Sequence, residues 1–400
     1  MASQSEVASA LSILCIWYQH NKRNKREKPA MKIVRTISCL FLAKIAQADV
    51  VQSMIDWVNS NGGSLNEKIE IRRLDPSDSS SPMGVFAKER LEQEEIIMYI
   101  PTSLYLNVWD EATNMDELEG VEAFEANNSN LCKLTHKLAK EMKLGEKSQF
   151  APYIAYLKTQ REGQLPALWA EEARTLLRSI SQPKSQIVDW IEDNFQKKGC
   201  ISEDPFEVHM LALVLQRSFD AAMIPLWDMV NHDNGRINTK NTSIYSKKGI
   251  EVMASRVIDE GEEIFASYDL CLDCFDVEDY WGTQEVLKDF GFVEPYPHRW
   301  IEYNNGKTIW YLIMEVDGEL KVAFDTVDED GFGVPDKEDV EILKKELKRL
   351  ESMESELQRK RNSSIPDYQW DTIVKFFHAK KMGLSMAIEA ASGNAAYVDF

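Results

Sequence analysis

The first part of the chain alternates between apolar and polar positions in a way that predicts one helix followed by short strands. Val51, Met54, Ile55 and Val58 recur at the spacing of a helix face, and this helix is expected to end at the glycine pair 62–63. Strands are predicted over 69–71, 84–87 and 95–100, with a further one over 104–108. A polar, serine-rich loop separates the first two.

Residues 112–220 change to a helical pattern. Apolar residues recur every three or four positions over 131–142, 169–180, 184–195 and 206–219, and each range is predicted to be a helix. After Pro225 the pattern returns to strands, predicted over 242–245, 250–254 and 263–267. Asn305-Gly306 and Asp317-Gly318 indicate two hairpin turns between alternating apolar residues.

From residue 336 the chain is predicted to be helical again. Apolar side chains form one stripe on a highly charged helix, which favours a docking face over a coiled coil; they are Val340, Leu343, Leu347, Leu350 and Leu357. Two more helices are predicted over 368–379 and 382–391. No glycine-rich phosphate loop follows a strand, which argues against a nucleotide-binding doubly wound sheet. The fold class is therefore predicted to be α+β, with short strands around a site.

Residues 1–48 differ from the rest and are interpreted as a targeting or disordered segment. No apolar run reaches the roughly 18 residues that a membrane span needs. Starting from Met31, an apolar core over 37–43 precedes Ala46-Gln47-Ala48, a pattern typical of signal cleavage, although Lys44 is unfavourable there. A removed targeting segment and a cytosolic tail both stay open, as does a cytoplasmic or organellar location.

Composition narrows the range of partners. The chain has 400 residues with 46 Lys+Arg and 66 Asp+Glu, a formal charge of −20, which argues against nucleic acid and favours basic protein segments. Six cysteines are too few for a disulfide scaffold. Cys271 and Cys274 have ligand-like spacing without a second pair, so we expect no metal site.

Several short motifs follow one another along the chain, and each has an ordinary structural interpretation when taken alone. Arg217 is a favourable charge at a helix C-terminus, and Tyr268 is an ordinary core tyrosine. The motifs are Ser81–Ala87, Gln216–Phe219, Pro225–His232, Glu262–Tyr268 and Phe290–Phe292, with Ala151–Leu157 before the second.

In this order the motifs resemble those of SET-domain methyltransferases. The similarity is to the subgroup that includes Rubisco large-subunit lysine methyltransferase and actin-histidine methyltransferase, over about residues 50–300 and more weakly in the tail. It implies a SET-type fold with an inserted helical region at about 112–220. It also implies a SET domain over 49–300, and a hairpin plus a helical C-terminal domain over 301–400 that resembles a substrate-binding domain.

The resemblance also implies a cofactor, S-adenosyl-L-methionine, and roles for individual residues. Tyr268 would be catalytic, and it would contact the substrate together with Arg217 and Asp228. The cofactor would be bound by Ser81, Pro82, Met83, Arg217, Asn231, His232 and Phe290. Capping the Asn-His turn is an equally open role for Asp228.

The chain departs from the family pattern near Tyr268. About ten extra residues precede Thr283-Gln284-Glu285, where the family has Asn-Ala-Glu, Gln216 replaces a serine, and Phe290 replaces a tyrosine. The leading hypothesis is lysine N-methylation of a non-histone protein by a monomeric enzyme. The alternatives are histidine N-methylation, for which a neutral imidazole needs no base, and a catalytically silent SET-like binding module.

Overall fold

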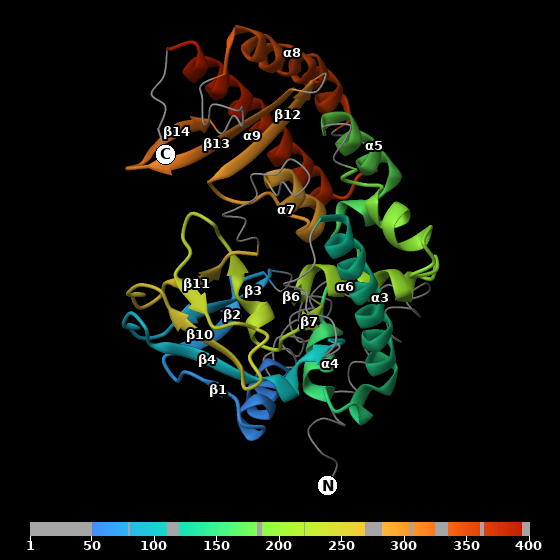
Figure 1. Cartoon of the computed structure of the whole chain (residues 1–400), viewed down its shortest axis with the longest axis vertical. Helices are drawn as coiled ribbons and strands as arrows, with labels where there is room; N and C mark the ends of the chain where they lie inside the picture. Colours follow the sequence, from blue (N-terminus) through green and yellow to red (C-terminus); the bar gives the residue numbers. More distant parts are fainter. Residues whose placement is uncertain are drawn as a thin grey trace, which may run out of the picture.

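The computed structural model describes most of the chain after residue 49. The described ranges are 50–78, 81–109, 120–181, 186–219, 221–268, 282–304, 307–324, 335–360 and 364–393. A strand-rich part, a helical part beside it and a C-terminal part of sheet and helices are visible in Figure 1. The predicted targeting segment and the Cys271–Cys274 pair lie outside the described residues.

The strand-rich part contains two four-stranded sheets. One has the order β1-β4-β10-β9 and the other β2-β3-β11-β8. The bounds are β1 Ser64–Leu65, β2 Ile69–Arg73, β3 Met83–Ala87, β4 Ile96–Pro101, β8 Asn231–His232, β9 Thr239–Asn241, β10 Gly249–Ala254 and β11 Glu263–Ala266. The pairs are antiparallel except β8 with β11, which is parallel.

Most predicted strands of this part are confirmed, with one error. The predicted strand 242–245 is wrong, because β9 ends at Asn241 and the amide of Ser246 then donates to the carbonyl of Ser243 in a turn. The predicted strand 104–108 is reduced to β5 (Leu106–Asn107). It joins a small sheet with β7 (Ala222–Met223) and β6 (Ser218–Phe219).

Three of the four helices predicted in the helical part are present, as α3, α5 and α6. This part contains α3 Gly120–Leu144, α4 Ala151–Leu157, α5 Glu171–Ile180 and α6 Pro205–Arg217. The helix predicted over 184–195 is wrong in form, because in its described part, from residue 186 on, the chain makes a turn that leads into the short π-helical segment η6 (Glu192–Gln196). A core of apolar side chains joins α3, α4 and α6 to the two large sheets.

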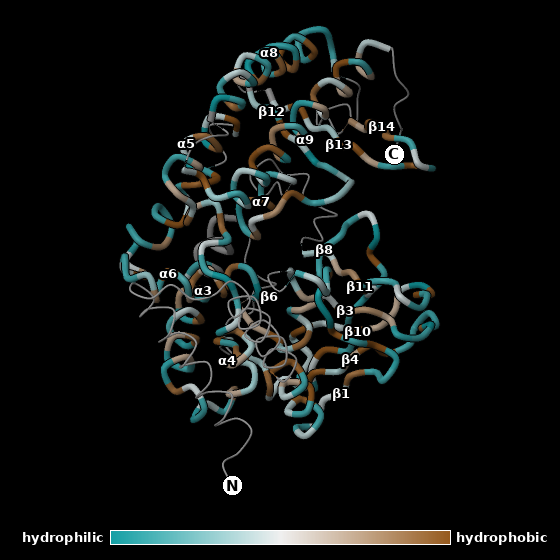
Figure 2. Tube along the Cα trace, turned by 180° about the vertical axis from the view of Figure 1, so that it is seen from behind, coloured by the Kyte–Doolittle hydropathy of each residue, from teal (hydrophilic) through white to brown (hydrophobic). Residues whose placement is uncertain are grey.

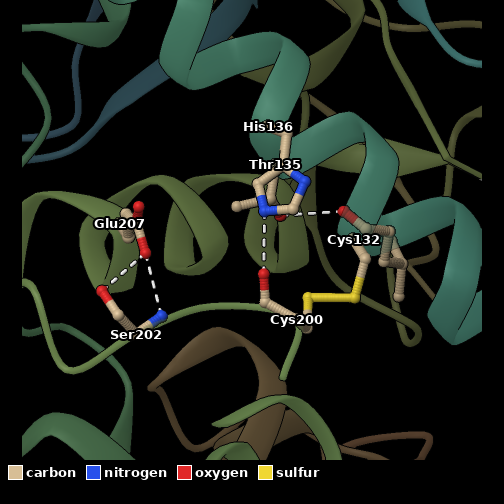
Figure 3. Close-up of a disulfide and its surroundings, with 7 residues drawn as sticks. Cys132, Thr135, His136, Cys200, Ser202 and Glu207 are labelled. Atoms are coloured by element: carbon tan, nitrogen blue, oxygen red, sulfur yellow. Dashed lines mark hydrogen bonds between the residues drawn. A yellow bond between two sulfur atoms is a disulfide. The ribbon is translucent and has the colours of Figure 1, made fainter. Parts of the chain in front are cut away.

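A disulfide, Cys132–Cys200, fastens α3 to the loop that precedes α6 (Figure 3). The two cysteines are separated by 68 positions in the sequence. His136, one turn after Cys132, has its Nε2 2.8 Å from the carbonyl oxygen of Cys200. Composition did not indicate this pairing, because two cysteines far apart in a helical region have no recognisable spacing.

The C-terminal part is a three-stranded sheet packed on two long helices. The elements are α7 Thr283–Phe290, β12 His298–Asn304, β13 Lys307–Val316, β14 Glu319–Phe324, α8 Lys337–Lys360 and α9 Asp367–Ala391. The hairpin at Asp317-Gly318 is confirmed, since Val316 pairs with Glu319. The first hairpin is also formed, with Asn304 opposite Lys307; its turn residues lie outside the described residues. The two helices predicted over 368–391 are one continuous helix, α9.

The apolar stripe of α8 is a docking face within the molecule. Leu343, Leu350 and Leu357 are buried in the C-terminal core, Val340 is also buried, and α8 packs against α9. Figure 2 shows hydrophilic and hydrophobic residues alternating along α8. The same core includes buried residues of α5, such as Leu177, so the C-terminal part packs onto the helical insert.

Candidate functional site

The last residue of α6, Arg217, reaches into a buried polar cluster. Asp204 caps the start of this helix by accepting from the Phe206 amide at 2.9 Å. At the other end Nη1 of Arg217 donates to the Asp228 carboxylate at 3.2 Å and to its carbonyl at 3.1 Å. The guanidinium also donates to the Tyr156 hydroxyl and to Gln160. Helix α6 thus places a cation beside the motif that contains Asp228.

Asp228 is held in the short helix η7 (Trp227–Met229), and its side chain is fully buried. The Tyr153 hydroxyl donates to Oδ2 at 2.9 Å, and Oδ2 also faces Arg217. The second oxygen, Oδ1, is buried without a hydrogen-bond partner among the described residues. A buried carboxylate oxygen in that state is costly unless water or a ligand supplies a donor.

Burial governs the charge states of this cluster. Desolvation raises the pKa of Asp228, and the Arg217 guanidinium opposes that shift. Burial works against the charge of Arg217, but Tyr156 and Asp228 together raise its pKa. Desolvation also raises the pKa of Tyr156 to about 12. The tyrosine hydroxyls therefore stay neutral, and the guanidinium keeps its charge.

Asn231 and His232 form the short strand β8 rather than the bend that the motif suggested. Asn231 pairs with Phe265 and His232 with Ala266 of β11. The Asn231 amide nitrogen donates to the Met83 carbonyl at 3.0 Å and to the Glu263 carboxylate at 2.8 Å. The parallel pairing brings the Asn-His motif alongside the strand that leads to Tyr268.

Gly84 makes room for this arrangement. A Cβ atom at this position would lie 2.5 Å from Oε1 of Glu263 and 3.0 Å from Nδ2 of Asn231. Both distances are shorter than ordinary contacts, so a side chain here would push the two groups apart. Desolvation raises the pKa of Glu263, whose carboxylate accepts from Asn231.

The imidazole of His232 is fully buried and uses both ring nitrogens inside the protein. Its Nδ1 accepts from the backbone amide of Tyr268 at 3.0 Å. Its Nε2 lies 3.0 Å from Oε2 of Glu294, which is as deeply buried. Only the backbone of His232 is therefore left for a cofactor.

Tyr268 follows β11 at the centre of an aromatic group. Its hydroxyl donates to the Val230 carbonyl at 3.1 Å. Ring centroids lie 4.7 Å from Phe290 and 5.2 Å from His232. Burial raises the pKa of Tyr268 well above its ordinary value, so the phenol is neutral.

Ser81 and Pro82 lead into β3, whose first residue, Met83, contacts Asn231. The carbonyls of these three residues accept from the Arg73 guanidinium at 2.6 Å, the Leu74 amide at 3.0 Å and the Asn231 amide at 3.0 Å, respectively. The carbonyl of Met83 thus connects this stretch to the Asn-His strand. The segment is tied to its neighbours by its backbone carbonyls.

The structure therefore places most of the predicted residues in direct contact with another of them. Direct contacts link Arg217 to Asp228, Asn231 to Met83, and Tyr268 to both His232 and Phe290. Sequence reasoning missed three kinds of participant: the hydroxyls of Tyr153 and Tyr156, the Glu263 carboxylate and Glu294. The tyrosines lie in the Ala151–Leu157 motif, which was the available signal, whereas Glu294 lies in no motif.

The family comparison covers most, but not all, of these residues. A model described as SET domain matches residues 83–269. The chain contains a SET domain. The resemblance to SET-domain methyltransferases is thereby confirmed, as is the α+β, SET-type fold. The finer boundaries at 49, 300 and 301 stay predictions, and the last two fall inside β12.

Two solved structures similar to this SET-domain protein are described as the SET domain of LSMT bound to lysine and AdoHcy, and the same domain bound to methyl-lysine and AdoHcy. The first has 14% sequence identity over 86% of this chain and 91% of that chain, with a TM-score of 0.49. The second has 13% identity over the same shares, with a TM-score of 0.47. No curated protein matches the sequence.

The described part of the chain offers neither a membrane-spanning helix nor a cluster of metal ligands. Within those ranges, no helix is both long and apolar enough to cross a bilayer. The same ranges contain no group of three or more His, Cys, Asp and Glu side chains that could hold a metal ion.

Proposed function

We propose that this SET-domain protein is an S-adenosyl-L-methionine-dependent protein-lysine N-methyltransferase acting on a non-histone protein. The observation that carries the proposal is the unpartnered oxygen Oδ1 of Asp228, which is buried beside Arg217. An amine N–H of an incoming lysine would supply the missing donor. The motifs shared with Rubisco large-subunit lysine methyltransferase support this choice of substrate class.

The residues around Tyr268 fit the proposed cofactor. When bound, S-adenosyl-L-methionine supplies an electrophilic methyl group on a positively charged sulfur. The rings of Tyr268, Phe290 and Phe292 lie with centroids 4.7 to 6.5 Å apart and offer the aromatic faces that attract a cation. Backbone groups of β8 and of residues 81–83 would hold the rest of the molecule.

Arg217 and Asp228 would prepare the amine. A free lysine amine has a pKa of about 10.4, so it must lose a proton to solvent before it attacks. The guanidinium balances the charge of Asp228, so burial among aromatic rings is the dominant effect and lowers the amine pKa. Asp228 Oδ1 then accepts an N–H of the amine and directs its lone pair. This alignment holds the amine close to the in-line geometry that methyl transfer requires.

Tyr268 would complete the alignment. Because its hydroxyl donates to Val230, the phenol oxygen presents its lone pairs to other groups. It would accept a second N–H of the amine at the point where the methyl group is transferred. The neutral phenol is therefore a positioning acceptor rather than a base.

The test is transfer of a labelled methyl group to protein. The full chain is incubated with methyl-labelled S-adenosyl-L-methionine and a lysate of the source cells, and the labelled residue is identified by mass spectrometry. Methyl-lysine on a non-histone protein supports the proposal. Methyl-histidine would instead establish the alternative activity on the same scaffold. Binding of S-adenosylhomocysteine without any transfer would overturn the enzymatic function and leave a binding module.

A further inference from the structure

Glu294 lies at the junction between α7 and β12, four residues after Phe290, and its side chain is almost completely buried. Oε2 lies 3.0 Å from Nε2 of His232, and Oε1 accepts from the Thr283 hydroxyl at 2.7 Å. The Asn234 amide lies 3.5 Å from the same carboxylate. Three donors thus surround a carboxylate that no motif identified, which is how proteins accommodate a buried anion.

The contacts of His232 fix where its ring proton lies. Nδ1 accepts from the Tyr268 amide, so the proton is on Nε2 and points to Glu294. A carboxylate that accepts a hydrogen bond from Nε2–H makes the opposite nitrogen a better acceptor, because hydrogen bonds in a chain polarise one another. Both side chains are at most 1% exposed, so water does not compete for either bond.

The far end of this chain of contacts is the proposed catalytic tyrosine. The amide that donates to His232 belongs to Tyr268, whose ring lies near the imidazole and Phe290. On the other side, Thr283 Oγ1 accepts from the Arg299 amide at 2.9 Å while donating to Glu294. The carboxylate therefore connects the start of β12 to the end of β11.

We propose that Glu294 is a positioning residue that acts through His232. It selects the Nε2–H tautomer, fixes the plane of the imidazole, and through Nδ1 holds the backbone of Tyr268 so that the phenol meets the substrate. The effect on turnover rests on the proposed methyltransferase function. The His232 tautomer and the hydrogen bond from the Tyr268 amide to Nδ1 do not rest on that function, so they can be tested separately.

The experiment compares Glu294→Ala and Glu294→Gln with wild type and with Glu302→Gln. Glu302 is a carboxylate of equal burial in β12, paired with Lys380 and absent from the contacts of His232. Nitrogen NMR of protein labelled at histidine and tyrosine reports the His232 tautomer and the Tyr268 amide. Calorimetry with S-adenosylhomocysteine reports binding, and labelled-methyl transfer reports turnover.

Glu294→Ala is expected to alter the His232 nitrogen shifts and move the Tyr268 amide resonance. It is also expected to lower kcat by roughly 10- to 100-fold, the range known for carboxylates that orient metal-bound histidines. The Kd of S-adenosylhomocysteine should change far less. Glu294→Gln, whose amide oxygen still accepts from Nε2–H, should keep the tautomer and recover most of the rate. Glu302→Gln should change neither the His232 tautomer nor the rate of methyl transfer.

The proposal is overturned if the His232 and Tyr268 signals of Glu294→Ala match those of wild type. It is also overturned if kcat falls no further than in Glu302→Gln. If wild type itself transfers no methyl group, the proposed function fails, and the NMR signals alone then decide the positioning role. If Glu294→Ala does not fold, Glu294→Asp replaces it. The shortened carboxylate should perturb the His232 and Tyr268 signals more than Glu294→Gln does. Equal signals in Glu294→Asp and Glu294→Gln would overturn the proposal.

Discussion

At the scale of single residues, removal of the Tyr268 hydroxyl should lower methyl transfer while the packing of the ring is kept. Tyr268→Phe keeps the ring contacts with Phe290 and His232 but removes the bond to Val230 and the acceptor for the amine. Methyl transfer is expected to fall by roughly 100-fold or more, as when one positioned polar group is removed from an active site. Tyr245→Phe, a change at a tyrosine 40% exposed, is the control and should keep full activity. Equal rates in both variants would contradict the role of Tyr268.

Gly84 is a second residue with a distinct prediction. An added methyl group would meet Glu263 and Asn231 at distances that require one of them to move. Gly84→Ala is therefore expected to lower the free energy of unfolding by about 1–3 kcal/mol, the range for overpacking. It should also weaken S-adenosylhomocysteine binding by displacing Asn231. Denaturant titration and calorimetry measure the two effects, and unchanged affinity would remove Asn231 from the proposed cofactor site.

The residues that sequence could predict are those with local motifs. Asn231, His232 and Tyr268 follow recognisable neighbours, so their proximity was predictable before the fold was known. Glu294 was not predictable in this way, because its contact with His232 joins positions 62 residues apart in the sequence. Tyr153 was visible in a motif, but the motif did not show that its hydroxyl would face Asp228.

At the scale of elements, the Cys132–Cys200 disulfide holds the helical insert together by joining α3 to the start of α6. Cys132→Ser with Cys200→Ser is expected to lower the free energy of unfolding by about 2–4 kcal/mol, because the unfolded chain is no longer closed into a loop. Denaturant titration without reductant measures the loss.

A reductant provides the matched control for that measurement. Dithiothreitol should destabilise wild type toward the stability of the double serine variant and leave the variant itself unchanged. If wild type and variant have the same midpoint without reductant, the bridge does not contribute to stability.

The error over α9 has its cause in long-range contacts. Helix α9 was predicted as two helices because Lys380 and Lys381 interrupt the apolar pattern. Lys380 is buried within α9, where its ammonium meets Glu346 of α8 at 2.7 Å and Glu302 of β12 at 3.5 Å. Gly383 then lets the Trp300 ring approach the helix, because a Cβ atom at position 383 would lie only 2.9 Å from the indole nitrogen. None of these partners is near in sequence, so periodicity alone could not show a continuous helix.

At the scale of the whole molecule, the C-terminal core shows how the parts are joined. It combines β12 to β14 with α8, α9 and buried residues of α5 from the helical insert. The prediction of a C-terminal domain over 301–400 did not include this insert helix, because α5 has the same amphipathic pattern as its neighbours. The buried charges of Glu302, Glu346 and Lys380 lie inside this core.

These charges make the stability of the whole molecule depend on pH. Burial raises the pKa of Glu302 to about 7, although Lys380 opposes the shift. Between the ordinary value near 4.5 and 7, the folded protein binds more protons at this site than the unfolded chain does. Stability from this group is therefore greatest below about pH 4.5 and falls as pH rises to about 7, by about 3 kcal/mol in total.

Glu302→Gln removes this contribution without removing the side-chain volume. The free energy of unfolding is measured by denaturant titration from about pH 4.5 to about pH 8. It should fall more steeply with rising pH for wild type than for the variant, and the difference between the two should level off above about pH 7. Glu346, whose pKa is lowered to about 2 despite burial because Arg349 and Lys380 contact it, acts in the opposite direction only below its ordinary value of 4.5. It therefore does not mask the effect of Glu302. Parallel pH profiles for wild type and variant would show that Glu302 does not govern how the C-terminal core responds to pH.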